Sequence, residues 1–108
     1  MAKVIWSPLA EKRLDEIGDY LANDQPARAA NFIEKLISST RRLQEFPESG
    51  HVVPENQAFR QVILQGYRLI YRVRGGIAEV VTIVSPGQNA DLKSQHQKTI
   101  AGGLGNED

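Results

Sequence analysis

The stretch GYRLIYRVRGGIAEVVTIV, residues 66–84, decides how this chain folds. Two runs rich in β-branched and aromatic residues, Tyr67–Val73 and Ile77–Val84, flank the pair Gly75-Gly76. A Gly-Gly pair between such runs provides the positive φ angles of a two-residue hairpin turn, so the stretch predicts two antiparallel strands. A third apolar run, Phe59–Leu64, lies just before it and extends the pair to a three-stranded meander.

The predicted hairpin has two chemically different faces. One face carries Tyr67, Leu69, Tyr71 and Val73 opposite Val84, Thr82, Val80 and Ala78, which suits a core packed against helices. The other pairs Arg74 with Ile77, Arg72 with Glu79, Ile70 with Val81 and Arg68 with Ile83. Aliphatic side chains among arginines call for cover, either from residues 90–100 or from another chain. A simple cross-strand ion pair between Arg72 and Glu79 is the alternative interpretation.

Two apolar stripes at helical spacing precede the meander and predict a helical hairpin. The first helix follows Ser7-Pro8, a favourable cap and first residue, and the second follows Asp24, a candidate cap, and runs to about Glu45. The stripes are Ala10, Leu14, Ile17 and Leu21, then Ala29, Phe32 or Ile33, Leu36, Thr40 and Leu43. With a first strand at Ala2–Trp6, the sequence predicts an α+β fold.

The length of 108 residues suits one domain. We expect this domain over residues 1–100 and a flexible tail over residues 101–108. Pro54 and Asn56 predict an irregular segment up to about Ala58, and Ala90–Ile100 allow a short C-terminal helix.

The composition excludes several classes of protein. The absence of cysteine excludes disulfides, thiolate metal sites and a cysteine nucleophile. Thirteen basic residues balance thirteen acidic ones, so direct binding to nucleic acid is not expected. No apolar run approaches the roughly 20 residues that span a bilayer, and we expect a cytoplasmic protein without a membrane partner. The meander region, residues 51–84, has four arginines against two glutamates and a local net charge of +2.

The sequence contains no convincing catalytic or metal-binding set. His51 and His96 have no spaced second ligand, and Ser85 is followed by Pro86-Gly87, so it is interpreted as a turn residue. A ribonuclease would need cations and an acid–base residue. Arg60, Arg68 and Arg72 are candidate cations, but the two nearest tyrosines fall on the predicted core face. We therefore predict no metal, no cofactor and no catalytic residue.

Five segments in the right order resemble the ParE/RelE toxin superfamily. They are Val4–Ala10 (VIWSPLA), Ile17–Leu21 (IGDYL), Leu43–Gly50 (LQEFPESG), Val53–Glu55 (VPE), and Arg60 with Gly66–Val73 (GYRLIYRV). The resemblance covers residues 3–84 and implies the same layout of strand, helical hairpin and antiparallel sheet. RelE-like members are ribosome-dependent messenger RNA endonucleases, whereas ParE-like members inhibit DNA gyrase. The long helical hairpin, the FPESG-to-VPE segment and the balanced charge are closer to ParE.

The resemblance to the nucleases is incomplete at the end of the last strand. Arg68 matches an arginine that RelE-like nucleases use. The family commonly has a further functional arginine after the last strand, but here the sequence is Val84-Ser85-Pro86-Gly87-Gln88-Asn89. The tyrosine that these nucleases carry beyond it is missing too, because no aromatic residue follows Tyr71.

The resemblance therefore implies a type II toxin that inhibits gyrase by binding and is neutralised by a ParD-like antitoxin. We expect a disordered or helical antitoxin tail to place apolar and acidic groups on the arginine-rich face. The candidate binding residues are Arg60, Arg68, Ile70, Arg72, Arg74, Val81 and Ile83. The alternatives are a RelE-like endoribonuclease, or a binding module that has lost toxicity.

Overall fold

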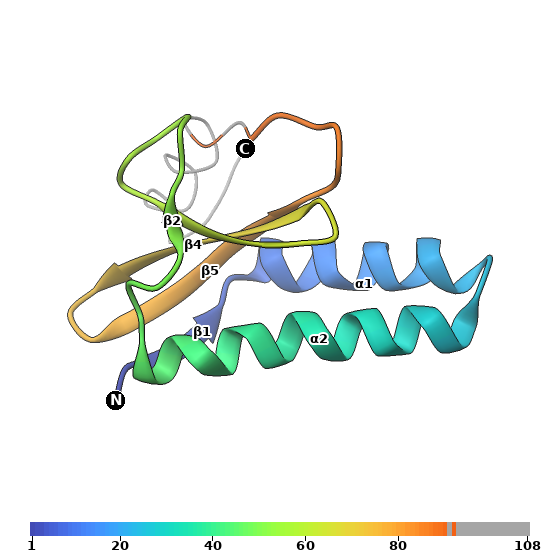
Figure 1. Ribbon diagram of the computed structural model, residues 1–108, viewed down its shortest axis with the longest axis horizontal. Helices are drawn as coiled ribbons and strands as arrows, with labels where there is room; N and C mark the ends of the chain where they lie inside the picture. Colours follow the sequence, from blue (N-terminus) through green and yellow to red (C-terminus); the bar gives the residue numbers. More distant parts are fainter. Residues whose placement is uncertain (91, 93–108) are drawn as a thin grey trace.

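The computed structural model describes residues 1–90 and residue 92, and confirms the α+β fold. The order of elements is β1 (Lys3–Trp6), α1 (Pro8–Ala22), α2 (Pro26–Glu45), β2 (His51–Val52), β3 (Arg60–Leu64), β4 (Tyr67–Arg74) and β5 (Ile77–Val84). The two helices lie side by side against one face of a sheet, and the segments around residues 53–59 and 85–90 lie on its other side (Figure 1). The expected tail, and all of the expected C-terminal helix except Ala90 and Leu92, fall outside the described residues.

The two helices bury the stripes that the sequence indicates. Ser7 caps α1, because its hydroxyl accepts a hydrogen bond of 3.0 Å from the Ala10 N–H. The buried residues of α2 are Ala29, Phe32, Leu36, Thr40 and Leu43. The expected cap at Asp24 is wrong, since Gln25 is the residue before α2 and makes no side-chain capping bond.

The sheet has five strands in the order β1-β5-β4-β3-β2. β3, β4 and β5 form the predicted antiparallel meander, and β1 joins it parallel to β5. The short strand β2 pairs with Arg60 and Gln61, within a segment that was expected to be irregular. The positive φ angles of Gly75 and Gly76, 56° and 78°, confirm the predicted hairpin turn.

A β-bulge changes the predicted register between β4 and β5. Arg74, Arg72 and Tyr71 face Ile77, Glu79 and Val80, but beyond the bulge Ile70 faces Thr82 and Leu69 faces Ile83. Val81 is the extra residue, and the buried Ser7 hydroxyl donates a hydrogen bond of 2.8 Å to its carbonyl.

The bulge moves Ile83 to the opposite face from the one predicted. Ile83 packs in the core under the helices, whereas Val84 lies on the outer face opposite Arg68. The assignment of Ile83 to the arginine-rich face was therefore wrong.

The sheet has a hydrophobic core on each face. The larger one lies between sheet and helices and includes Leu36, Leu43, Leu69, Tyr71 and Val80. The smaller one, which we call the second core, lies on the outer face. It consists of Val53, Phe59, Ile70, Val81, Val84 and Leu92, with Ala90 packed against it. The described residues therefore cover part of the outer sheet face, and the part that they leave uncovered is the candidate surface for a partner.

Candidate functional site: the outer face of the sheet

The outer face of the sheet has a covered half and an open half. Over the covered half, Val53 and Phe59 come from the segment between β2 and β3, and Ala90 and Leu92 come from beyond β5. Ile70 is fully buried there, and Val81 is 8% exposed. Both aliphatic residues named as binding candidates on this half are thus covered by their own chain.

Arg68, at the border of the covered half, is hydrogen-bonded to other residues of the chain. Its guanidinium donates two hydrogen bonds to the Glu55 carboxylate, at 2.8 and 2.7 Å, and its Nε donates one to Gln61 Oε1 at 2.7 Å. The Ala90 N–H also approaches Glu55 Oε2, at 3.4 Å. Glu55 therefore connects β4 to the two segments that cover the second core. It is also the ion-pair partner of Arg68, the arginine that matches a nuclease residue.

The ion pair between Glu55 and Arg68 predicts a pH-dependent contribution to stability. The Arg68 hydrogen bonds lower the pKa of Glu55 from 4.5 to about 2. A lowered folded-state pKa stabilises the protein above pH 4.5, and this stabilisation is lost as the pH falls towards 2. We expect Glu55→Gln to reduce the free energy of unfolding by about 1 kcal/mol at pH 7, since the pair is partly exposed, and by much less near pH 2.5.

Urea unfolding of the wild type and Glu55→Gln at both pH values measures this difference. The control is the same replacement in an Arg68→Gln background, where the difference should not depend on pH in this range. A loss of equal size at both pH values would show that the charge of Glu55 does not contribute.

The open half lies around the Gly75-Gly76 end of the hairpin and the edge strand β1. The register places Lys3 beside Ile77 and Ile5 beside Glu79, so these side chains share the outer face with the arginines of β4. We call this surface the open patch; it consists of Lys3, Ile5, Arg72, Arg74, Ile77 and Glu79. Arg72 Nε donates a hydrogen bond of 3.0 Å to Glu79 Oε1, which confirms the cross-strand ion pair.

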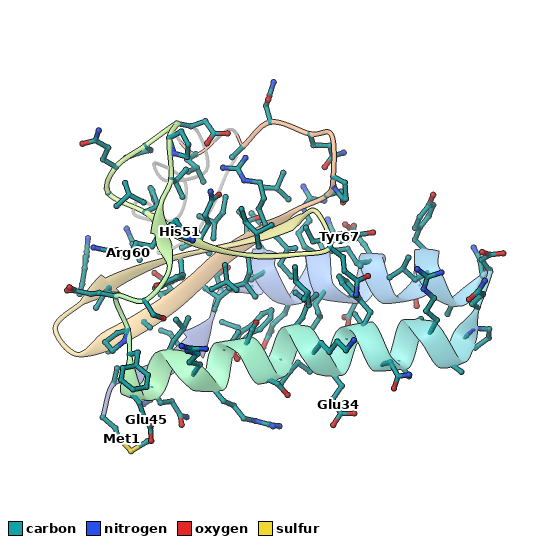
Figure 2. The ribbon with its side chains drawn as sticks, viewed as in Figure 1. Met1, Glu34, Glu45, His51, Arg60 and Tyr67 are labelled. Carbon is teal, nitrogen blue, oxygen red and sulfur yellow. The ribbon has the colours of Figure 1, made fainter. Side chains whose placement is uncertain are left out.

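Arg60 lies away from the open patch, although it was named with the other candidates. It pairs with Tyr71, on the face that points to the helices, and lies near His51 at the end of the sheet opposite Tyr67 (Figure 2). Its Nη1 donates hydrogen bonds to the Glu48 and Gly50 carbonyls, at 3.1 and 2.9 Å. Arg60 therefore holds the FPESG segment against the sheet.

The tyrosines of β4 have structural contacts. Tyr71 is fully buried, its hydroxyl accepts a hydrogen bond of 2.9 Å from the Gly50 N–H, and burial raises its pKa above the ordinary value. A buried phenol with a raised pKa is a poor acid or base near neutral pH. Tyr67 packs on Phe32, with ring centroids 4.9 Å apart.

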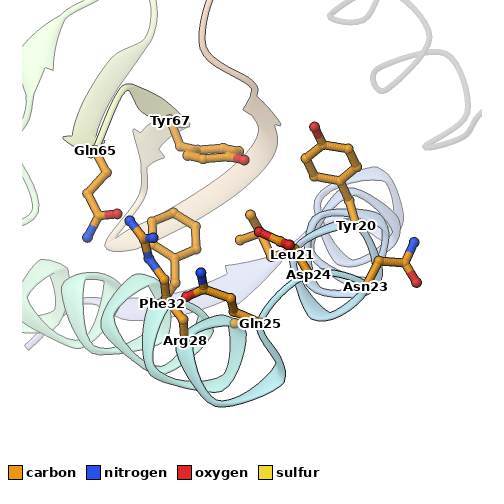
Figure 3. Close-up of a pocket in the computed structure, with 10 residues that line it drawn as sticks. Tyr20, Leu21, Asn23, Asp24, Gln25, Arg28, Phe32, Gln65 and Tyr67 are labelled. Atoms are coloured by element: carbon orange, nitrogen blue, oxygen red, sulfur yellow. The ribbon is translucent and has the colours of Figure 1, made fainter.

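A hollow outside the open patch lies at the end of the helical hairpin where α1 turns into α2. Tyr67 and Tyr20 stand on opposite sides of it, with Leu21 between them and with Phe32 and Arg28 on the side of Tyr67 (Figure 3). Tyr20 is 73% exposed. A neighbouring hollow shares the two tyrosines and reaches Ser85 and Asn89 at the end of β5. None of the predicted site residues except Ile83 lines either of them.

The candidate residues are thus divided among several places in the fold. Arg72 and Arg74 come together in the open patch, Arg68 is clamped by Glu55, and Arg60 belongs to the helix side. Sequence reasoning missed Lys3 and Ile5, because it did not pair β1 with β5. It placed Ile77 on this face but did not name it as a binding residue.

Metal and membrane features give no further site. Among residues 1–90 and 92, no group of three potential metal ligands occurs, and His51 is an exposed residue of β2. His96 lies outside the described residues. Within that same part of the chain, neither helix has the length and apolarity needed to cross a membrane.

Comparisons with known proteins agree with the arrangement of these elements. Residues 4–90 match the family described as the ParE toxin of the type II toxin-antitoxin system, parDE. Y4kP of Sinorhizobium fredii, which is named as a candidate toxin, is 30% identical over 88 residues, covering 80% of this chain and 90% of that protein. Toxin RelE2 of Caulobacter vibrioides is 30% identical over 84 residues, covering 77% and 93% of the two chains.

A solved structure has the same fold. A chain of the chromosomal ParDE toxin-antitoxin system from P. aeruginosa superposes with a TM-score of 0.71 and 22% identity, covering 80% of this chain and 97% of that one. The match to the family spans β1 to the segment beyond β5, which includes both helices and the whole sheet. This chain belongs to the ParE toxin family of type II toxin-antitoxin systems.

Proposed function

We propose that this protein is a cytoplasmic toxin that inhibits DNA gyrase by binding it and that a cognate antitoxin neutralises it. Family membership supports the toxin role. The observation that favours binding over catalysis is the state of Arg68, whose Nε, Nη1 and Nη2 each donate a hydrogen bond to Glu55 or Gln61. An arginine held in this way already has a carboxylate partner, which it would have to release before it could stabilise a phosphate in the transition state of RNA cleavage.

The surroundings of β4 and β5 support the same proposal. The Tyr71 hydroxyl is buried and bonded to Gly50. Ser85, Gln88 and Asn89 follow β5, where the resemblance to the RelE-like nucleases implies a cation. Cleavage through a ribose 2′-hydroxyl needs an acid, a base and a cation that reach the same phosphate. Within the described residues, this end of the sheet does not bring the three together.

Expression of the chain alone from a tightly repressed promoter tests the proposal. We expect growth arrest with filamentation and DNA damage, and inhibition of supercoiling when the purified chain is added to gyrase. Co-expression of the cognate antitoxin should restore growth.

Two other outcomes would contradict the gyrase proposal. Arrest with rapid loss of messenger RNA and unaffected supercoiling would favour the RelE-like nuclease. Normal growth with the folded chain present at a high level would favour a binding module without toxicity.

A further inference from the structure

We propose that the open patch is where an acidic segment of the antitoxin docks, with an aliphatic side chain of that segment against Ile5 and Ile77. The inference rests on the proposed neutralisation by an antitoxin and assigns it to a place on this chain. It differs from the site expected from sequence, which centred on Ile70, Val81 and Ile83.

The open patch is the part of the outer face, across β1, β5 and β4, that residues 1–90 and 92 leave uncovered. Ile5 and Ile77 are each 37% exposed, whereas Ile70 is fully buried and Val81 is 8% exposed on the same face. The β1–β5 register places Lys3 beside Ile77 and Ile5 two residues further along β1, so the two isoleucines are diagonal neighbours. Two adjacent exposed isoleucines on a strand face form a small apolar site that one aliphatic anchor can cover.

The charges around this apolar site favour an acidic occupant. Three cations, Lys3, Arg72 and Arg74, stand against Glu79 alone, a net charge of +2, and Arg72 already takes up Glu79. Lys3 and Arg74 make no ion pair with any residue that the structure describes. An acidic segment with an apolar anchor matches both parts of this surface.

Two other occupants match it less well. A second copy of this chain would bring Lys3 and Arg74 against the same cations, and like charges in contact disfavour association. A nucleic acid would need more cations and would leave the isoleucines without an apolar partner. The antitoxin segment is therefore the occupant that the chemistry favours.

The test uses the purified cognate antitoxin, titrated calorimetrically against the full chain and its variants. We expect Ile77→Asp and Arg74→Glu each to weaken binding at least tenfold. The matched controls are Ile63→Asp, at a 53% exposed isoleucine of the same sheet face in β3, and Arg41→Glu, at an exposed arginine of α2. Both controls should change the affinity less than threefold. Circular dichroism of each variant verifies the fold, and Arg74→Glu remains informative if Ile77→Asp is unstable.

The outcomes separate this inference from the proposed function. Wild-type affinity in both patch variants, or equal losses in patch and control variants, would overturn the inference while the antitoxin proposal stands. The absence of any complex with the wild-type chain would overturn both. Displacement of the antitoxin by a single-stranded oligonucleotide, with binding that Arg74→Glu weakens, would mark the patch as a nucleic-acid surface and overturn the inference.

Discussion

Replacement of Phe59 with alanine is expected to lower the free energy of unfolding by about 3–5 kcal/mol. The Phe59 side chain is 1% exposed and packs in the second core with Val53, Ile70, Val81 and Val84. Its removal leaves a cavity between the sheet and the segment that covers it, a segment that also contributes Val53 to this core. The backbone hydrogen bond from the Val53 N–H to the Phe59 carbonyl, at 2.9 Å, does not depend on the side chain.

Urea unfolding of Phe59→Ala and Phe46→Ala measures the contribution of the second core. Phe46 is the matched control, because its side chain is 54% exposed at the end of α2, and we expect its removal to cost less than about 1 kcal/mol. Similar losses in the two variants would mean that the second core adds little to stability. The covering segment would then be a loosely held loop rather than part of the domain.

The second core also explains why the open patch is small. On the covered half, the chain supplies from its own loops the apolar contacts that the sequence pattern assigns to a partner. On β4 and β5, a partner that binds without rearranging the described residues therefore meets the part of the outer face beyond Ile70 and Val81. The energy of the Phe59 contacts sets how strongly the chain resists any opening of the covered half.

The fold could be predicted because several independent local signals agree. The Gly75-Gly76 turn, the Ser7-Pro8 helix start and two helical stripes each have a direct physical cause in backbone or packing. The face of Tyr67, Leu69 and Tyr71 was identified as a core from alternation alone, and Leu69 and Tyr71 are fully buried. Elements with strong periodicity were thus predicted together with their buried sides.

The bulge at Val81 could not be predicted from the alternation of residues. Val80, Val81, Ile83 and Val84 are all aliphatic, so a shift of one residue leaves the hydrophobic pattern unchanged. The bulged residue is held by long-range contacts, among them the hydrogen bond from the Ser7 hydroxyl to the Val81 carbonyl, between residues 74 positions apart. A contact of that separation leaves no local signal in the sequence.

Only part of the candidate site could be predicted from the sequence, for a similar reason. The excess of arginine in β4 is visible in the sequence, and it directed the predicted site to the outer face. Whether each arginine is free to bind a partner protein depends on its long-range contacts within the chain. These are Glu55 for Arg68, the Glu48 and Gly50 carbonyls for Arg60, and Glu79 for Arg72. Only Arg74, next to the turn, could be expected to stay exposed from its position in the hairpin.

Replacement of Gly50 with alanine is expected to lower the free energy of unfolding by about 2–5 kcal/mol. A Cβ atom at this position would lie 2.6 Å from the Tyr71 hydroxyl oxygen and 2.8 Å from the Gln61 carbonyl oxygen. The ring and the backbone of β3 would have to move apart, and the buried hydrogen bond between the Gly50 N–H and the Tyr71 hydroxyl would be strained or lost. The glycine of the FPESG segment is thus required by the close approach of β3 and Tyr71.

A double-mutant cycle with Tyr71→Phe identifies the cause of this loss. Tyr71→Phe alone should cost about 1–2 kcal/mol, since the Gly50 N–H loses its acceptor. Combined with Gly50→Ala, it removes the atom 2.6 Å from the new methyl group, so the double variant should be more stable than the sum of the single losses implies. Gly18→Ala is the control, because the nearest atom to its Cβ would be Ile33 Cδ1 at 3.7 Å, and alanine favours the helix by up to about 1 kcal/mol. Strictly additive losses would show that the Gln61 carbonyl or the Tyr71 ring carbon Cε1, each 2.8 Å from the added Cβ, excludes a side chain at residue 50, and not the Tyr71 hydroxyl.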